Sequence, residues 1–370
     1  MKKLFVFLMI AFSSHLFAEE NRDDVLLYEF DTYTHKASIA GAEYLNPSTI
    51  FWDDSVLYRG VAYEVTGIKD FAFYKNSTLR SFWFMMNKGY IGKAAFAGCS
   101  NLKDFALFGG EKLTIYTYAF QRCYNLSKIT IATDRLILIP DKESPYYPLR
   151  NTFQGCTGID TVQWRVKEFE TLHNMHESLF AASKDHISYF EFSEDVRCIP
   201  KFICQDFSAL EKVDIADKIN EIGESAFQNC IRLTSVIIPG SVKVIGESAF
   251  EGCASLENLV IGNGVRKIGS NAFQYCRSIK SVIIPSTVTK IEYEAFSGCT
   301  NLQTIHIQSP HTMIEIASSA IPSNTKVIFS DGVTMIGGVV QTKYNTTKQK
   351  PKQNLDKKVP QTNPKQGLTK

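Results

Sequence analysis

The fold is decided by a stretch in the C-terminal half, Ile222-Gly-Glu-Ser-Ala-Phe-Gln-Asn-Cys-Ile-Arg-Leu-Thr-Ser-Val-Ile-Ile-Pro239, which recurs in strict phase with a period of 23 residues. The recurring phenylalanines are Phe227, Phe250, Phe273 and Phe296, and the recurring cysteines are Cys230, Cys253, Cys276 and Cys299. A fixed period of this length indicates a solenoid, because one unit cannot bury its apolar side chains without stacking on its neighbours.

The same frame extends upstream, where it is less regular. Counted from Ala72-Phe73, the chain holds ten copies, and the third to the sixth are irregular. The longest interval between copies contains residues 134–149, whose Pro140, Pro145 and Pro148 predict a loop. A degenerate eleventh unit, residues 314–329, is predicted to be a C-terminal cap.

Each copy predicts one short strand. In Leu-x-x-Val-x-Ile-Pro, Val236 and Ile238 should point into the core and Ser235 and Ile237 outward, and Pro239 should end the strand. We predict that Glu-Ser-Ala-Phe-Gln-Asn-Cys returns the chain as a helical turn. The predicted fold class is an α/β solenoid: a curved leucine-rich repeat with a short parallel strand per repeat, helical turns or loops on the opposite face, and an N-terminal strand cap.

The 23-residue unit resembles a known repeat class. Its form, Leu-x-x-Val-x-Ile-Pro-x-x-Val-x-x-Ile-Gly-x-x-Ala-Phe-x-x-Cys, resembles the leucine-rich repeats of the BspA-like surface antigens over roughly residues 66–307. Residues 63–68 also resemble the lead-in that those proteins place after an N-terminal strand cap. The resemblance implies exported surface proteins of bacteria and protozoa, several of which act as adhesins toward host matrix proteins or other cells. The irregular copies, and the lack of the membrane span or further C-terminal modules of many relatives, depart from that pattern.

The N-terminus predicts export. Met1-Lys2-Lys3 precedes an apolar run at residues 4–12, and Ala18 supplies the small residue of a cleavage site, so residues 1–18 are predicted to be a signal peptide. No other run reaches the roughly 18 apolar residues of a membrane span. We therefore expect a secreted or cell-surface protein with an N-terminal β cap over residues 19–65 and a repeat domain over residues 66–330.

Charge is unevenly distributed along the chain. The net charge is +2, but residues 341–370 hold eight Lys and one acid, Asp356, whereas residues 19–340 carry 30 basic and 37 acidic residues. An acidic body does not favour nucleic-acid binding. Residues 331–370 are predicted to be a basic disordered tail, which is either a solvated extension or a segment that adsorbs to an anionic surface.

Seven of the nine cysteines occupy one slot of the repeat and are interpreted as a ladder of buried thiols. They are Cys99, Cys123, Cys156, Cys230, Cys253, Cys276 and Cys299. A disulfide framework or a metal array stays open as the alternative in an exported protein. Cys198 and Cys204 lie off the ladder, and whether they form a disulfide is also open.

Chemical motifs are sparse. His173 and His176 have a spacing that could share a metal on a helix, but without a third ligand nearby they are interpreted as surface histidines. We expect no metal, no cofactor and no enzymatic activity, since the motifs of nucleophilic and metal-dependent hydrolases are missing from the sequence. If the protein were an enzyme, the irregular residues 134–186 would hold its site.

The outward positions of the strands are the candidate binding surface. Ile237, Val260 and Ile283 fall on adjacent copies and form an aliphatic stripe that is predicted to contact a protein partner. Trp83, Tyr189 and His306 are further candidates. The hypothesis is a protein that binds an extracellular or cell-surface protein, and so mediates adhesion, through its strand face. The alternative is a structural envelope-associated protein that its Lys-rich tail holds to an anionic surface.

Overall fold

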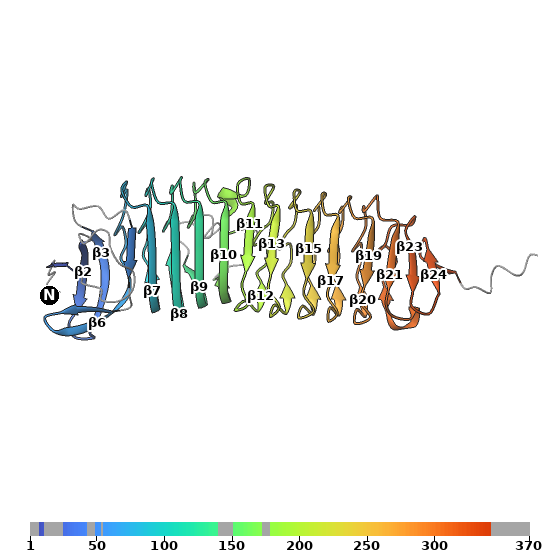
Figure 1. Ribbon diagram of the computed structural model, residues 1–370, viewed down its shortest axis with the longest axis horizontal. Helices are drawn as coiled ribbons and strands as arrows, with labels where there is room; N and C mark the ends of the chain where they lie inside the picture. The colour runs from blue at the N-terminus through green and yellow to red at the C-terminus, as the bar shows by residue number, and fades with distance from the viewer. Residues whose placement is uncertain are drawn as a thin grey trace, which may run out of the picture.

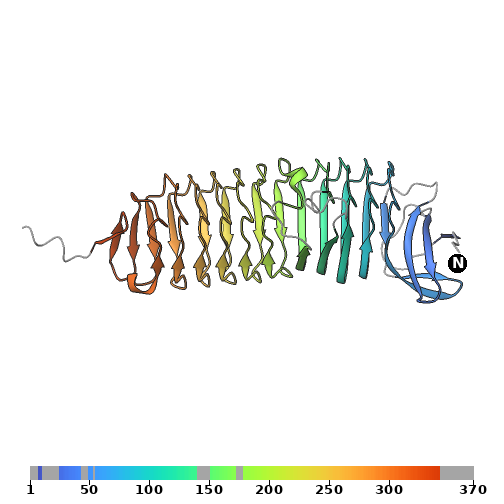
Figure 2. The same cartoon turned by 180° about the vertical axis from the view of Figure 1, so that it is seen from behind.

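The computed structural model describes residues 7–10, 25–42, 49–52, 55–139, 151–171 and 178–341. These residues form one elongated stack of rungs, one rung for each copy of the repeat, which runs from the blue N-terminal end to the red C-terminal end in Figure 1 and is seen from behind in Figure 2. Within the described ranges, no helix has both the length and the apolar character needed to span a membrane.

The N-terminal end of the stack is a small set of mostly antiparallel strands. These are β1 (Phe7–Ile10), β2 (Val25–Asp31), β3 (Lys36–Ala42), β4 (Thr49–Trp52), β5 (Ser55–Tyr58) and β6 (Val61–Ile68). Phe30 stacks on Tyr58 with ring centroids 4.5 Å apart and meets Tyr63 edge-on at 5.0 Å. This aromatic cluster covers the end of the repeat core, at the position where we predicted a cap, and β1 falls within the predicted signal peptide.

The first half of the stack has long strands. They are β7 (Ser81–Ile91), β8 (Asp104–Tyr116), β9 (Lys128–Ile139) and β10 (Thr161–Thr171), all parallel to one another. The regular copies place Pro239 or Pro285 directly after the fourth strand residue, whereas β7 has Met85 and β10 has Arg165 there. Proline would end the strand at this point, because it has no amide hydrogen to donate. Its absence permits a longer strand but does not by itself produce one, since residues 258–261 form a strand that ends before Gly262.

In the second half each rung has two short strands that belong to two walls of the stack. The first wall contains β11 (Tyr189–Phe192), β13 (Lys212–Ile215), β15 (Ser235–Ile238), β17 (Asn258–Ile261), β19 (Ser281–Ile284), β21 (Thr304–Ile307) and β23 (Lys326–Phe329). The second wall contains β12 (Cys198–Ile199), β14 (Glu221–Ile222), β16 (Val244–Ile245), β18 (Lys267–Ile268), β20 (Lys290–Ile291) and β22 (Glu315–Ile316). Equivalent residues of successive copies pair, as Ser235 does with Asn258, so the period sets the register.

The C-terminal end differs from the predicted boundary. After β23 the chain adds two antiparallel strands, β24 (Thr334–Ile336) and β25 (Val339–Gln341), to the first wall. The predicted tail, residues 331–370, therefore starts too early, because part of it pairs with the sheet. Residues 342–370 lie outside the described part of the chain.

The predicted helical turns are wrong. In the described ranges the helices are two short 3-10 turns, η1 (Ala181–Ser183) and η2 (His311–Met313). In the return segment, successive backbone amides instead donate alternately to the next copy and to a residue of the same turn. Ser225 and Phe227 donate to carbonyls of the next copy at 2.9 and 2.8 Å, while the intervening Ala226 and Gln228 donate to the carbonyls three residues back. Ser225 adopts a φ of 51°, which no α-helix contains.

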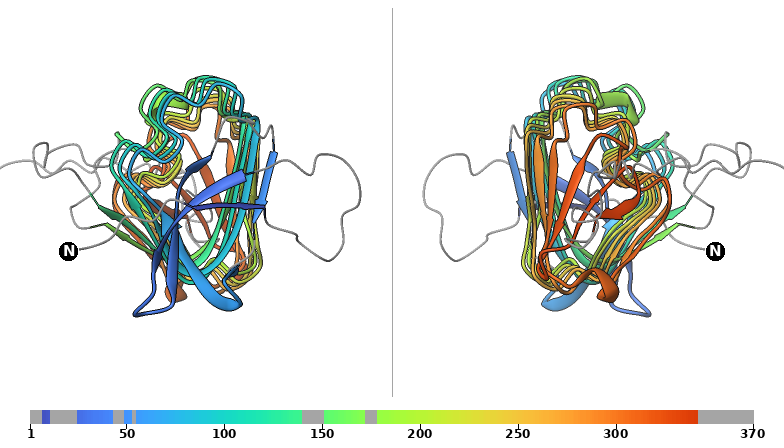
Figure 3. Two further views of the ribbon diagram at one scale, coloured as in Figure 1. Left: turned by 90° about the vertical axis from the view of Figure 1, so that its left-hand side faces the viewer. Right: turned by 90° about the vertical axis from the view of Figure 1, so that its right-hand side faces the viewer.

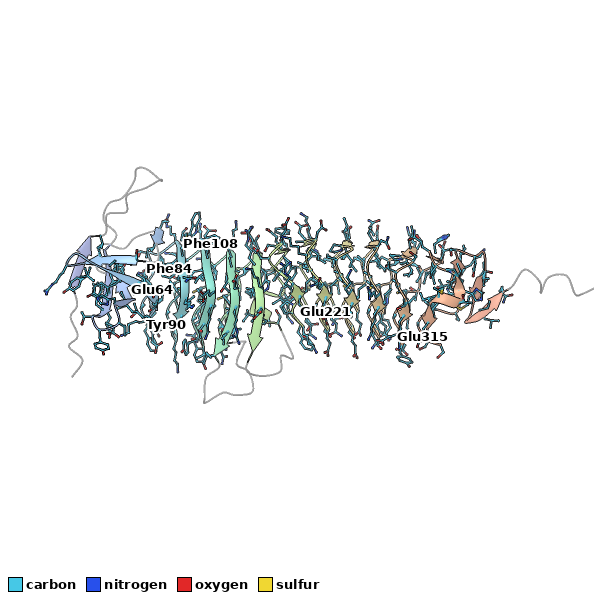
Figure 4. All side chains as sticks on the ribbon, turned by 90° about the horizontal axis from the view of Figure 1, so that it is seen from below. Glu64, Phe84, Tyr90, Phe108, Glu221 and Glu315 are labelled. Atoms are coloured by element: carbon cyan, nitrogen blue, oxygen red, sulfur yellow. The ribbon has the colours of Figure 1, made fainter. Side chains whose placement is uncertain are left out.

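The turns explain why the stack is straight. Rungs of a parallel sheet are ~4.8 Å apart, whereas an α-helix is about 10 Å across, so one helix per copy would need a wider spacing on the turn side and would bend the stack into a horseshoe. Turns that bond to the next copy have the same rise as the strands. The stack therefore has little curvature in Figures 1 and 4, and its walls superpose when viewed end-on in Figure 3. The predicted α/β class and the predicted curved shape are both corrected by this arrangement.

The core runs along the axis of the stack. Buried strand residues such as Val236 and Ile238 line it, and the repeated phenylalanine fills its centre in every copy but the sixth, which has Cys204 at this position. In the regular copies these rings are stacked, with centroid distances of 5.0 Å for Phe227–Phe250, 5.4 Å for Phe250–Phe273 and 5.2 Å for Phe273–Phe296. A column of stacked rings therefore joins the four regular rungs.

Candidate functional site

The outward side of the first wall, named the strand face, presents side chains in rows. The register places one row on Trp83, Ala106, Thr130, Gln163, Glu191 and Asp214, then on Ile237 and Val260, and then on Ile283, His306 and Ile328. A strand places every second residue on the same face, so this row is a direct consequence of the repeat period. Its chemistry changes along the stack.

In the C-terminal half the row is aliphatic. Ile237, Val260 and Ile283 are 66%, 53% and 57% exposed, although their neighbours in sequence on either side are buried. Ile237 and Val260 are register partners, and β19 follows β17 along the stack in Figure 1. These three side chains, named the aliphatic patch, therefore lie together, and His306 continues the row as the register partner of Ile283.

In the N-terminal half the row meets a second apolar area. Trp83, Met85 and Phe108, named the aromatic patch, are exposed on β7 and β8, and Met85 and Phe108 are register partners. Met85 and Phe108 line a shallow groove of 360 Å³, and Figure 4 shows Phe108 among the long strands. Sequence reasoning identified Trp83 and missed the other two, because it ended each strand after four residues. The signal was the continued alternation past Phe84 without a proline.

Between the two patches the row is polar and hydrogen-bonded. Thr130 Oγ1 donates to Gln163 Oε1 at 2.9 Å, and Gln163 Nε2 donates to Glu191 Oε2 at 2.9 Å. Arg165 Nη2 lies 3.6 Å from Glu191 Oε1. These groups satisfy one another across three rungs, so they present a fixed polar surface between the apolar patches.

Tyr189 belongs to this polar centre. Its hydroxyl donates to Asp214 Oδ2 at 2.6 Å, and Lys212 Nζ donates to the same oxygen at 2.9 Å while lying 4.9 Å from the tyrosine ring. Burial and the Asp214 carboxylate raise the pKa of Tyr189. Burial alone would raise the pKa of Asp214, but the hydrogen bonds from Tyr189 and Lys212 outweigh it and lower that pKa. The structure thus separates Tyr189 from the aliphatic patch.

The seven ladder cysteines point into the core. All are buried, and each Sγ lies 2.8 to 3.2 Å from a backbone carbonyl oxygen of the preceding copy. Burial raises the pKa of Cys253 and of Cys299 to about 12. A small buried thiol donor is thus used in seven of the ten copies.

All nine cysteines are free thiols, with Cys198 exposed and Cys204 buried. The described ranges hold no group of three His, Cys, Asp or Glu side chains arranged for a metal ion. The predicted pair His173 and His176 lies outside those ranges.

The repeat matches a protein family. A family model described as "BspA type Leucine rich repeat region" matches residues 58–142, 149–257 and 220–346, in six copies. These matches cover well over half of the chain. No curated protein matches it.

Two of the solved structures that this chain matches are bacterial leucine-rich repeat proteins. A leucine-rich cell surface protein of Faecalibacterium prausnitzii is 20% identical, with 82% of this chain and 93% of that chain covered and a TM-score of 0.32. A leucine-rich repeat protein of Bacteroides ovatus is 18% identical, with 86% and 100% covered and a TM-score of 0.39. The TM-scores are low, so the fold of this chain rests on its own strand register.

Proposed function

Because this chain belongs to the BspA-type leucine-rich repeat family, we propose that it is an exported protein of the cell surface or extracellular space that binds another protein through its strand face. The proposed role is adhesion to a host matrix protein or to a protein of another cell. The predicted signal peptide, residues 1–18, supports export, and the basic tail is proposed to add contact with an anionic surface.

The observation that carries this proposal is the aliphatic patch. Large aliphatic side chains on adjacent rungs, each more than half exposed, form a contiguous apolar area that soluble proteins usually cover. Ser235, Asn258 and Ser281 lie in the neighbouring outward row and give the patch a polar margin. An apolar centre with a polar margin is the usual anatomy of a protein interface.

Rigidity supports the same function. Ile237 and Val260 stand on strands that pair with each other, and Ile283 stands on a strand that pairs with β21, so a partner would meet side chains that are already ordered. Little conformational entropy is then lost on binding. The hydrogen-bonded centre around Gln163 and Glu191 would favour partners of complementary polarity and reject others.

The test is a pair of matched lysine variants of residues 19–341. Ile237→Lys with Ile283→Lys places two charges in the patch, and Ile231→Lys with Ile336→Lys places two charges at exposed isoleucines outside it. Each chain is immobilised and exposed to purified matrix proteins and to solubilised cell-surface proteins, and the retained species is identified by mass.

The dissociation constant of each chain for that species is then measured. Loss of two central contacts of about 1.4 kcal/mol or more each should weaken binding roughly 100-fold in the patch variant only. Equal binding by both variants would contradict the assignment of the patch, and retention of nothing by the unchanged chain would contradict protein binding.

A further inference from the structure

A second concave surface lies on the wall of turns, away from the strand face. This turn-side groove has a volume of 420 Å³ and spans the first four copies of the repeat. Its lining residues are Phe71, Tyr74, Lys93, Ala94, Tyr118, Gln121, Asn151 and Gln154. None of these residues belongs to the strand face, so the groove is independent of the proposed protein-binding surface.

The groove arises from a difference between neighbouring copies. The second copy has Ala94 and Ala97, both buried, at positions where the first copy has Phe71 and Tyr74. The third copy again has a large side chain, Tyr118, at this position. Successive copies are ~4.8 Å apart, so aromatic side chains stand on rungs about 10 Å apart with a small residue between them. A gap of this width accommodates one flat ring.

The aromatic residues of the walls are held in strained backbone. Phe71 and Tyr118 have φ of 60° and 61°, a region that bulky residues rarely adopt. Ser225 and Ser248 occupy the same slot in later copies, with φ of 51° and 52°. Phe71 is 53% exposed, so burial in the core does not offset its strain. The left-handed conformation is therefore a property of the repeat, and what distinguishes the first and third copies from the second is that they place an aromatic side chain on it.

The polar groups of the groove are mostly neutral amides. Gln121 Nε2 donates to Gln154 Oε1 at 2.6 Å, and Asn151 Nδ2 lies 3.5 Å from the hydroxyl oxygen of Tyr118. Each amide offers both donors and acceptors. Lys93 is the single charged residue of the lining, and its Nζ lies 5.8 Å from the ring of Tyr118.

We propose that the turn-side groove binds one saccharide unit of a glycan. A pyranose ring has apolar faces made of C–H groups, which suit the walls formed by Phe71 and Tyr74 on one side and Tyr118 on the other. Its hydroxyls both donate and accept hydrogen bonds, as the amides of Gln121 and Gln154 do. Aromatic walls with convergent polar groups suit a small polar ligand, and 420 Å³ lies within the usual size of small-molecule sites.

The experiment uses residues 19–341 and ligand-observed saturation-transfer NMR. The saccharide probes are galactose, mannose, N-acetylglucosamine, N-acetylgalactosamine, glucuronate and N-acetylneuraminate. A proline-rich peptide represents the alternative class of ligand, because such peptides also bind aromatic grooves. The test variant is Phe71→Ser with Tyr118→Ser, since serine already occupies this slot in later copies. Tyr275→Ser is the control, because Tyr275 is an exposed residue of positive φ outside the groove.

We expect at least one saccharide to bind the unchanged chain and the Tyr275→Ser control equally, and the double variant at least tenfold more weakly. Gln154→Ala, which removes one exposed amide from the lining, should also weaken binding, so the test does not depend on the double variant alone. Ile237→Lys with Ile283→Lys should leave saccharide binding unchanged. Binding of none of the sugars, binding of the peptide alone, or equal binding by the double variant would overturn the proposal.

Discussion

The column of stacked phenylalanine rings makes a quantitative prediction about stability. Phe250 is fully buried, with its ring centroid 5.0 Å from that of Phe227 and 5.4 Å from that of Phe273, and nearly parallel to both. Truncating a buried phenylalanine to alanine costs about 3–5 kcal/mol, and each ring pair contributes about 0.5–1.5 kcal/mol beyond the buried area. That measured range already includes the lost ring contacts, and Phe250→Ala loses two pairs, so we expect its free energy of unfolding to fall by an amount in the upper part of the range, about 4–5 kcal/mol.

Phe296→Ala is the matched control, since Phe296 is equally buried but stacks on Phe273 alone within the column. Its loss should be about 1 kcal/mol smaller. Urea unfolding followed by circular dichroism gives both values. Because Trp52, Trp83 and Trp164 all lie in the first half of the chain, tryptophan fluorescence separately reports that half. A loss below about 2 kcal/mol for Phe250→Ala, or equal losses for both variants, would refute a rigid ring column.

Three further predictions concern charge, thiols and processing. Asp214→Asn should lower the free energy of unfolding at pH 7 by less than about 1 kcal/mol, because the Lys212–Asp214 ion pair that it breaks is exposed. The pKa of Asp214 is lowered in the folded chain, so its contribution to the free energy of unfolding is fully present above the unfolded pKa of about 3.9 and is lost as the pH falls through the folded pKa. Urea titrations should therefore show a difference in stability between Asp214→Asn and the unchanged chain at pH 7 and no difference at pH 2. In the native protein only Cys198 should react with iodoacetamide. The reaction should be slow at pH 8, because loss of hydration and the nearby Glu221 raise the pKa of Cys198 to about 11. After denaturation and treatment with iodoacetamide, mass analysis should show all nine cysteines labelled. Secreted protein should begin at Glu19 by N-terminal sequencing, and an N-terminus at Met1 would contradict the predicted signal peptide.

The regular copies were the most predictable part of the molecule. With a fixed period, the outward positions of Ile237 and Val260 follow from alternation alone, although only the first of these two copies has a proline after the fourth strand residue. The aromatic patch could not be derived in the same way, because the first copies depart from the regular pattern in the length of their strands. Their strands continue past Phe84, so Met85 becomes a surface residue that a four-residue strand would have left in a turn.

The turn side was less predictable for a different reason. A segment such as Glu224–Cys230 contains good helix formers, and its turn conformation depends on hydrogen bonds to the next copy, which the local sequence does not show. The turn-side groove depends on differences between copies, such as Ala94 beside Phe71. A consensus repeat averages such differences away, so the groove becomes visible only when neighbouring rungs are placed side by side.

Hydrogen bonds that point along the axis give the stack a defined response to mechanical load. Tension between its two ends loads the interfaces between rungs in series, so the interface with the fewest bonds opens first. The second wall is one sheet from β12 to β22, whereas the first wall divides into separate sheets between β13 and β15 and between β17 and β19. The aliphatic patch extends across the second of these divisions, between Val260 and Ile283. A partner bound there would contact both sides of one of the weakest interfaces between rungs, and its binding would make the protein more resistant to extension.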